Sequence, residues 1–257
     1  MSWDPALYLT FGDLRLRPAL DLLARVDLAA PRSVVDVGCG AGNVTAVLSK
    51  RWPQAAITGV DNSAEMLATA ATRLPQANWQ LADLADWQPD TPPDLIYSNA
   101  ALHWLDGHQT LFPRLARMLR PGGVLAVQMP NNFGSPSHQC AYRAAREGPW
   151  AATLQPLLRE RPVLPPAGYY ELLAPLVQSL DIWETEYMQI LEGDNPVADW
   201  NKGALLVPLL GALDEAHKRA FEARYRELVA TAYPRRPDGK TLFPFRRLFM
   251  VARVSGG

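Results

Sequence analysis

The stretch that decides the fold is SVVDVGCGAGNVTAVL, residues 33–48. It begins with a short β-rich run, passes through a turn with three glycines, and continues with apolar residues at helical spacing. A buried strand that leads through a glycine turn into an amphipathic helix is typical of a parallel α/β sheet. Asp36 lies in the strand just before the turn, where a phosphate-binding loop would not favour a negative charge.

The same alternation continues outward from this stretch as far as residue 129. Helical patterns over NVTAVLSKRW, SAEMLATAATRL and HQTLFPRLARML alternate with further β-rich runs, with Ser63 as a predicted N-cap and RPGG (120–123) ending the third helix. The predicted order is β-α-β-α-β-β-α-β, a parallel sheet with helices on both faces. The predicted strands are SVVDVG, AAITGVD, NWQLAD, DLIYSN and GVLAVQM.

Proline and glycine become frequent beyond residue 130, which indicates helices interrupted by loops. We expect these helices near 137–160, 168–178, 195–210 and 214–232, with strands over 180–191 and 245–254 that return to the sheet. An amphipathic helix, RPALDLLARV (17–26), precedes the first strand and follows an arm that carries tryptophan and tyrosine.

Composition narrows the class of partner. A net charge of −1 gives no basic face for nucleic acid or an anionic membrane. The sequence contains no apolar run of the roughly 20 residues that a bilayer requires, and acids stand where a secretory signal would be apolar, so we expect a cytoplasmic protein. Cys39 and Cys140 are too few for a disulfide framework or a zinc cluster, and we expect no metal site.

The glycine turn favours a cationic ligand over a pyrophosphate. The dinucleotide fingerprint GxGxxG would need glycine at position 43, where the chain has Asn43. Asp36 would repel a pyrophosphate, which makes a dehydrogenase the weakest alternative. S-adenosylmethionine carries an ammonium and a sulfonium, and is the predicted cofactor.

Acids follow the next two strands, where a nucleoside needs hydrogen-bond acceptors. Asp61 is placed to accept from the ribose hydroxyls and Asp83 from the adenine amino group, although either acid can instead cap the segment that follows. Asn99 ends the fourth strand and either supports the methionine moiety or caps the next segment. The predicted cofactor-binding residues are Asp36, Gly38, Gly40, Asp61, Asn62, Met66, Asp83, Leu84 and Asn99.

Four motifs together resemble the class I S-adenosylmethionine-dependent methyltransferases across residues 33–129: VVDVGCGAGN, GVDNSAEML, ADLADW and LRPGGVLAV. This resemblance implies a Rossmann-like sheet, mostly parallel with one antiparallel strand, and a helical cap. Further stretches, including WDPALYLTFGDLRLRPALDLLARV, DLIYSNAALHWL and RRLFMVAR, resemble the bacterial trans-aconitate 2-methyltransferases nearly end to end. That resemblance implies transfer of a methyl group from S-adenosylmethionine to one carboxylate of trans-aconitate, giving a monomethyl ester and S-adenosylhomocysteine.

A tricarboxylate substrate calls for cationic and hydrogen-bonding side chains. Arginine forks suit planar carboxylates, and we expect Arg15, with Arg17 or Arg247, to hold the two carboxylates that do not react. His103 is the candidate for orienting the reacting carboxylate. For each of these the alternative is structural: a solvated surface arginine or a satisfied core histidine. Further candidates for the lining of the substrate pocket are Tyr8, Trp104, Asn132, Tyr169 and Tyr170, with burial in the core as the alternative for the aromatic residues.

The expected domain organisation has four segments. They are an N-terminal arm and helix covering the active site (1–30), the cofactor-binding core (31–130), a helical cap insertion (131–180), and the last two strands with a helical insertion between them (181–257). The partner is a small polycarboxylate, and the chain is expected to be a monomer or a weak homo-oligomer. Two alternatives remain: a methyltransferase for another small acid or a malonyl thioester, and a non-catalytic S-adenosylmethionine-binding module.

Overall fold

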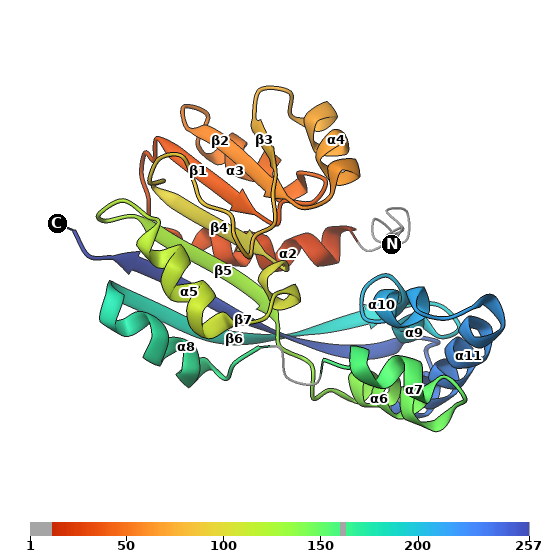
Figure 1. Ribbon diagram of the computed structural model, residues 1–257. Coiled ribbons are helices and arrows are strands. Elements are labelled where there is room, and N and C mark those ends of the chain that lie inside the picture. The colour runs from red at the N-terminus through yellow and green to blue at the C-terminus, as the bar shows by residue number, and fades with distance from the viewer. Residues whose placement is uncertain (1–11, 160–162, 257) are drawn as a thin grey trace. The chain divides into compact units, whose positions relative to one another are not determined.

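The computed structural model describes residues 12–159 and 163–256, with side chains from residue 16 onward (Figure 1). These residues divide into two compact units. We call residues 16–130, 163–185 and 247–256 the sheet unit, and residues 131–159 and 186–246 the helical unit.

In the described part of the chain, seven strands form one sheet in the order β3-β2-β1-β4-β5-β7-β6. The first five are parallel where they pair, and β7 runs antiparallel to β5. This arrangement confirms the predicted fold class, including the antiparallel strand. The strands are β1 (Ser33–Val37), β2 (Ala56–Asp61), β3 (Asn78–Leu81), β4 (Leu95–Asn99), β5 (Val124–Pro130), β6 (Val177–Leu191) and β7 (Thr241–Val254).

The helices of the sheet unit follow the predicted alternation, and Figure 1 shows α5 and α8 side by side over the lower part of the sheet. Ser63 caps α4 as predicted, since its Oγ accepts a hydrogen bond from the Met66 backbone N–H at 3.3 Å. On another face, the Tyr97 hydroxyl of β4 donates to the Ala19 carbonyl of α2. The helices are α2 (Gly12–Ala24), α3 (Asn43–Arg51), α4 (Ala64–Arg73), α5 (His108–Arg117) and α8 (Pro166–Leu173), with short 3₁₀ turns η1 (Leu102–Trp104) and η3 (Ala174–Leu176).

The helical unit has a hydrophobic core of its own. Large aromatic side chains fill it: Trp150 and Phe221 meet edge to face, as do Trp200 and Phe243. Burying several such side chains is enough to hold short helices that would be marginal alone. The helices are α6 (Pro136–Glu147), α7 (Ala151–Leu154), α9 (Pro196–Lys202), α10 (Val207–Gly211) and α11 (Glu215–Ala232), with the 3₁₀ turn η2 (Gln155–Leu157).

Three of the helices predicted beyond residue 130 differ from the structure for local backbone reasons, and the helix predicted over 17–26 is α2 (Gly12–Ala24). The helix expected over 137–160 is divided because Gly148, in an extended conformation, ends α6. The helix expected over 195–210 breaks at Gly203 into α9 and α10. The helix expected over 168–178 ends at Leu173, since β6 already begins at Val177.

The long strands β6 and β7 each belong to both units. β6 leaves the sheet unit after Thr185, and β7 enters it at Arg247. No helix among the described residues is long and apolar enough to cross a membrane.

Candidate active site

The turn after β1 forms the floor of the candidate site. Gly38 has φ +75°, and a Cβ there would lie 2.1 Å from the Cβ of Ala101, so only glycine fits. The Gly38 N–H donates to the Val60 carbonyl at 2.8 Å, which ties the turn to β2. Gly40 has φ +52°, and no described atom lies within 4 Å of where its Cβ would be. The turn therefore presents bare backbone toward open space.

Asp61 joins the glycine turn to the end of β2. Its Oδ2 accepts from the Gly40 N–H at 2.8 Å and its Oδ1 from the Ser63 N–H at 3.0 Å. Because Ser63 is the N-cap of α4, helix capping is not the role of Asp61. The half-buried carboxylate has further lone pairs, so it can accept from ligand hydroxyls as well.

Asp36 is a buried carboxylate beside the turn. Only 1% of the residue is exposed, and its Oδ2 accepts a 2.6 Å hydrogen bond from the Thr45 hydroxyl of α3. Burial, partly offset by the Thr45 hydrogen bond and aided by the Asp61 charge, raises the pKa of Asp36 to about 7. A positively charged group nearby would favour the ionised form. Burial and the same two carboxylates also raise the pKa of the Cys39 thiol, which keeps it protonated.

Asp83 follows β3 and lies on the surface. Its Oδ1 accepts from the Ala85 N–H at 2.9 Å and closes a turn that leads into no helix, so helix capping is not its role either. Arg114 of α5 fastens the same segment by donating to the Leu84 carbonyl at 2.7 Å and the Trp87 carbonyl at 3.0 Å. Nearby on β3, Leu81 is 62% exposed, an apolar surface suited to an aromatic ring.

The segment after β4 carries His103 and Trp104 in the turn η1. His103 is buried, Trp104 is half exposed, and their ring centroids lie 4.8 Å apart. Buried His108 contacts η1: its Nε2 lies 3.0 Å from the Leu102 carbonyl oxygen, and its Nδ1 lies 2.6 Å from the Tyr169 hydroxyl. Because the carbonyl can only accept, Nε2 donates to it, and Nδ1 accepts the tyrosine proton.

The remaining predicted substrate residues belong to several different elements. Arg247 on β7 is buried, and its guanidinium donates to the Gln128 Oε1 on β5 at 3.4 Å. Arg17 is exposed on α2 and lies 3.9 Å from Asp21. Tyr170 is exposed on α8 and Asn132 is buried in the helical unit, whereas Tyr8 and the side chain of Arg15 lie outside the described residues.

The predicted cofactor residues do gather at one edge of the sheet. The turn after β1 and the ends of β2, β3 and β4 meet at the carboxyl edge, where open α/β sheets bind their ligands. Asn62 is exposed and Met66 half buried at the start of α4, and Leu84 lies against Gly38, 3.7 Å from where a Cβ would be. Asn99 is half buried at the end of β4.

Comparison with known proteins agrees with this arrangement. A family model described as "Methyltransferase domain" matches residues 34–123. The trans-aconitate 2-methyltransferase of Azoarcus sp. (strain BH72) is 51% identical over 253 residues, 98% of each chain, and that of Methylobacterium radiotolerans is 47% identical over 255 residues, again 98% of each. The chain belongs to the trans-aconitate 2-methyltransferase family. It is therefore a methyltransferase.

Solved structures support the fold of this trans-aconitate 2-methyltransferase family member. The YcgJ protein of Bacillus subtilis superposes with a TM-score of 0.62 at 14% identity, covering 94% of this chain and 99% of its own. Phosphoethanolamine N-methyltransferase 2 of Haemonchus contortus, in complex with phosphomonomethylethanolamine and S-adenosylhomocysteine, gives 0.56 at 14% identity, covering 94% of this chain and 53% of its own.

Several residues of the site escaped the sequence reasoning. Thr45 and Arg114 lie on helices whose spacing is explained by packing alone, so their contacts with Asp36 and Leu84 become visible only in the fold. Gln128 did leave a signal, because it is a polar residue inside the otherwise apolar run VLAVQM.

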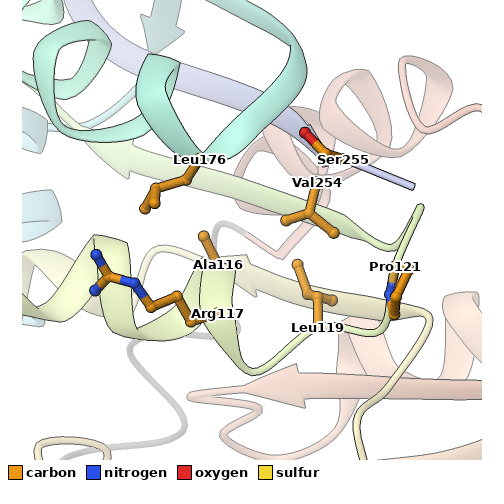
Figure 2. Close-up of a pocket in the computed structure, with 7 residues that line it drawn as sticks. All are labelled: Ala116, Arg117, Leu119, Pro121, Leu176, Val254 and Ser255. Atoms are coloured by element: carbon orange, nitrogen blue, oxygen red, sulfur yellow. The ribbon is translucent and has the colours of Figure 1, made fainter. Parts of the chain in front are cut away.

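A separate pocket lies at the opposite edge of the sheet unit. Figure 2 shows its lining, which comes from the end of α5, the loop before β5, the 3₁₀ turn η3 and the end of β7. The loop leads into the amino end of β5, so this pocket is distinct from the carboxyl edge. Its lining residues are Ala116, Arg117, Leu119, Pro121, Leu176, Val254 and Ser255.

Proposed function

We propose that the protein transfers the methyl group of S-adenosylmethionine to one carboxylate of trans-aconitate, releasing the monomethyl ester and S-adenosylhomocysteine. The observation that carries this proposal is the extent of the similarity: 51% identity runs over 98% of the chain, far beyond the methyltransferase domain at 34–123. The similarity therefore also covers the parts of the chain outside that domain, where most of the proposed substrate-binding residues lie.

The carboxyl edge of the sheet fits S-adenosylmethionine. Asp36 is a buried carboxylate whose ionisation a cationic methionine group would favour, and Asn99 Oδ1 at the end of β4 has no hydrogen-bond partner among the described residues. Asp61 would accept hydrogen bonds from the ribose hydroxyls, and Asp83 and exposed Leu81 would hold the adenine ring. When bound, S-adenosylmethionine supplies a methyl group on a sulfonium, which is transferred without the electron pair of its carbon–sulfur bond.

The acceptor needs no general base. A carboxylic acid with a pKa of about 4 is ionised at neutral pH, so its oxygen attacks the methyl carbon directly. The task of the protein is to align the two reactants and exclude water. In this proposal His103 donates to the reacting carboxylate, and Trp104 and Tyr170 line the pocket. Arginines hold the carboxylates that do not react, because a tight ion pair on the attacking oxygen would weaken it as a nucleophile.

Among the arginines whose side chains the structure describes, Arg247 is the buried one, and burial strengthens its attraction for an anion. Arg15, Arg17 and Tyr8 are the other proposed substrate-binding residues. Tyr169 is buried and contributes through its hydrogen bond to His108. We place the reaction in the cytoplasm, where thiols such as Cys39 stay reduced. The acceptor is a small polycarboxylate, and the enzyme acts as a monomer or weak homo-oligomer.

The test is an assay of S-adenosylhomocysteine release with trans-aconitate, cis-aconitate, citrate, isocitrate and a malonyl thioester as separate substrates. The proposal predicts turnover selective for trans-aconitate, with the ester identified by mass spectrometry. Preference for another acid would assign a different acceptor within the same chemistry. Binding of S-adenosylmethionine without turnover of any acid would indicate a non-catalytic binding module.

A further inference from the structure

Hydrogen-bonding character changes across the carboxyl edge of the sheet. The neighbouring strands β2, β1 and β4 contribute acceptors: the carboxylates of Asp61 and Asp36 and the unpartnered Oδ1 of Asn99. The next strands, β5 and β7, contribute the donors of Gln128 and Arg247. A cationic cofactor suits the first half, and an anionic acceptor suits the second. Methyl transfer between the two belongs at the boundary of β4 and β5.

Gln128 stands at this boundary. In the strand register Asn99 pairs with Gln128, and Arg247 pairs with Pro130. Pro130 is two residues after Gln128 on β5, so Gln128, Asn99 and Arg247 lie on the same face of the sheet. Gln128 is fully buried, at 0% exposure. Its Nε2 has no hydrogen-bond partner among the described residues.

Arg247 fixes the orientation of the Gln128 amide. A guanidinium only donates, so the amide must turn its oxygen toward Arg247, as the 3.4 Å contact has it. The two donor hydrogens of Nε2 are then left for another acceptor. A buried amide donor without a partner destabilises the fold unless a ligand completes it.

We propose that Gln128 binds a carboxylate of the acceptor substrate through Nε2, side by side with Arg247. This inference rests on the proposed function and adds to it a substrate-binding residue. The amide donates to the anion without neutralising it, and Arg247 supplies the charge. Together they form a site for a carboxylate that does not react, next to the one that does.

Two substitutions test the role of Gln128. Gln128→Met keeps the length of the side chain and removes the amide, and we expect the KM for trans-aconitate to rise at least tenfold. Gln128→Glu pairs with Arg247 and places a second negative charge at the site, so we expect a rise of at least a hundredfold. For both variants the Kd for S-adenosylhomocysteine, measured by calorimetry, should stay within about twofold of wild type.

A stability measurement separates binding from a structural role. Because Gln128→Met removes an unsatisfied donor together with the acceptor of the long 3.4 Å contact from Arg247, its Tm without substrate should stay close to that of wild type, while the KM rises. Gln189→Met, which changes another buried strand glutamine, is the matched control and should leave the KM unchanged. An unchanged KM in Gln128→Met, or a rise only in proportion to lost Tm, overturns the inference.

A binding arm distinguishes this inference from the proposed function. Calorimetry with S-adenosylhomocysteine present measures the Kd of wild type and Gln128→Met for each polycarboxylate. If wild type binds another polycarboxylate but not trans-aconitate, and the substitution weakens that binding at least tenfold, the proposed substrate is wrong while the inference stands. If wild type binds no polycarboxylate, both are overturned.

Discussion

At the residue scale, ionisation of Asp36 has two opposite effects. It lowers the stability of the fold, and in the proposed function it favours binding of the cationic cofactor. The carboxyl group ionises near pH 3.8 in the unfolded chain and near 7 in the fold. Between these values the folded protein holds a proton that the unfolded chain has lost, so raising the pH through this window lowers stability. At about 1.4 kcal/mol per pKa unit, the upper bound on the loss is about 4 kcal/mol.

Asp36→Asn should remove this pH-dependent loss of stability. The amide oxygen of the new side chain still accepts from Thr45, so we expect the Tm advantage of the variant over wild type to grow from pH 4 to 7 and then level off. Affinity for S-adenosylmethionine should fall at least tenfold. In wild type that affinity should weaken below pH 7, because a proton then competes with the cation for Asp36. Calorimetric titrations from pH 5.5 to 8.5 measure the affinities, and thermal denaturation over pH 4 to 8 measures the Tm.

Asp94→Asn is the matched control for Asp36→Asn. Asp94 is equally buried, but its carboxylate pairs with Arg120 and accepts from the Arg32 and Ser33 N–H groups at the amino end of β1. Its replacement should lower the Tm and leave cofactor affinity unchanged. A lower Tm for Asp36→Asn at pH 8 would contradict the assignment of Asp36.

Two glycines of the same turn should respond differently to alanine. Gly38→Ala places a Cβ against Ala101 and should unfold or strongly destabilise the protein. Gly40→Ala meets only open space, so it should cost about 1–2 kcal/mol of backbone strain while blocking the cofactor. Thermal denaturation and cofactor titration of both variants measure the difference. Normal cofactor affinity in Gly40→Ala would show that the ligand does not approach this turn.

The candidate cofactor residues could be predicted one at a time because each lies at or just beyond the carboxyl end of a strand. Asp36, Asp61 and Asp83 stand at positions where a parallel sheet must bring strand ends together. The contact between Arg247 and Gln128 was not predictable, because it joins residues 119 positions apart in the chain through an antiparallel pairing. No local sequence pattern predicts the register between β5 and β7.

At the scale of elements, His108 and Tyr169 connect the start of α5, η1 and α8. The Tyr169 hydroxyl accepts from the Leu164 N–H at 3.2 Å and donates to His108, which in turn donates to the Leu102 carbonyl. All these donors and acceptors are satisfied, so a buried network holds the turn that carries His103, in addition to the backbone hydrogen bonds of the turn itself.

Tyr169→Phe should therefore loosen the turn that carries His103. We expect a 5- to 50-fold fall in kcat/KM for the acceptor acid, with little change in the Kd for S-adenosylhomocysteine. Tyr142→Phe is the control, since it removes another buried tyrosine hydroxyl, one that donates to the Arg159 carbonyl in the helical unit. If both variants lose kcat/KM equally, the network has no specific positioning role.

Element boundaries were harder to predict than element order. The alternation of strands and helices up to residue 129 was confirmed, because it depends on apolar periodicity over whole elements. In the helical unit, the apolar periodicity continued through Gly148 and Gly203, where α6 and α9 end, and at Gly148 a Cβ would lie 2.2 Å from the Trp150 ring. The strand β7 also starts four residues before the predicted 245–254, at Thr241.

At the scale of the whole molecule, all cofactor-binding candidates belong to the sheet unit. Hydrogen exchange with and without S-adenosylhomocysteine should therefore show added protection in peptides covering residues 36–45, 61–66 and 83–87. A ligand at 100 times its Kd stabilises the folded state by about 2.7 kcal/mol, enough for a clear difference in exchange. Added protection concentrated instead in α6 and α11 would place the cofactor elsewhere.

The two strands shared by both units restrict how the gene can change in length. β6 and β7 pass from one unit to the other without a loop, after Thr185 and before Arg247. Inserting or deleting one codon inside either strand would turn every later side chain to the opposite face of the ladder. Length variation among natural relatives should thus be confined to the connecting loops, such as 192–195 and 233–240, while both strands tolerate only substitution.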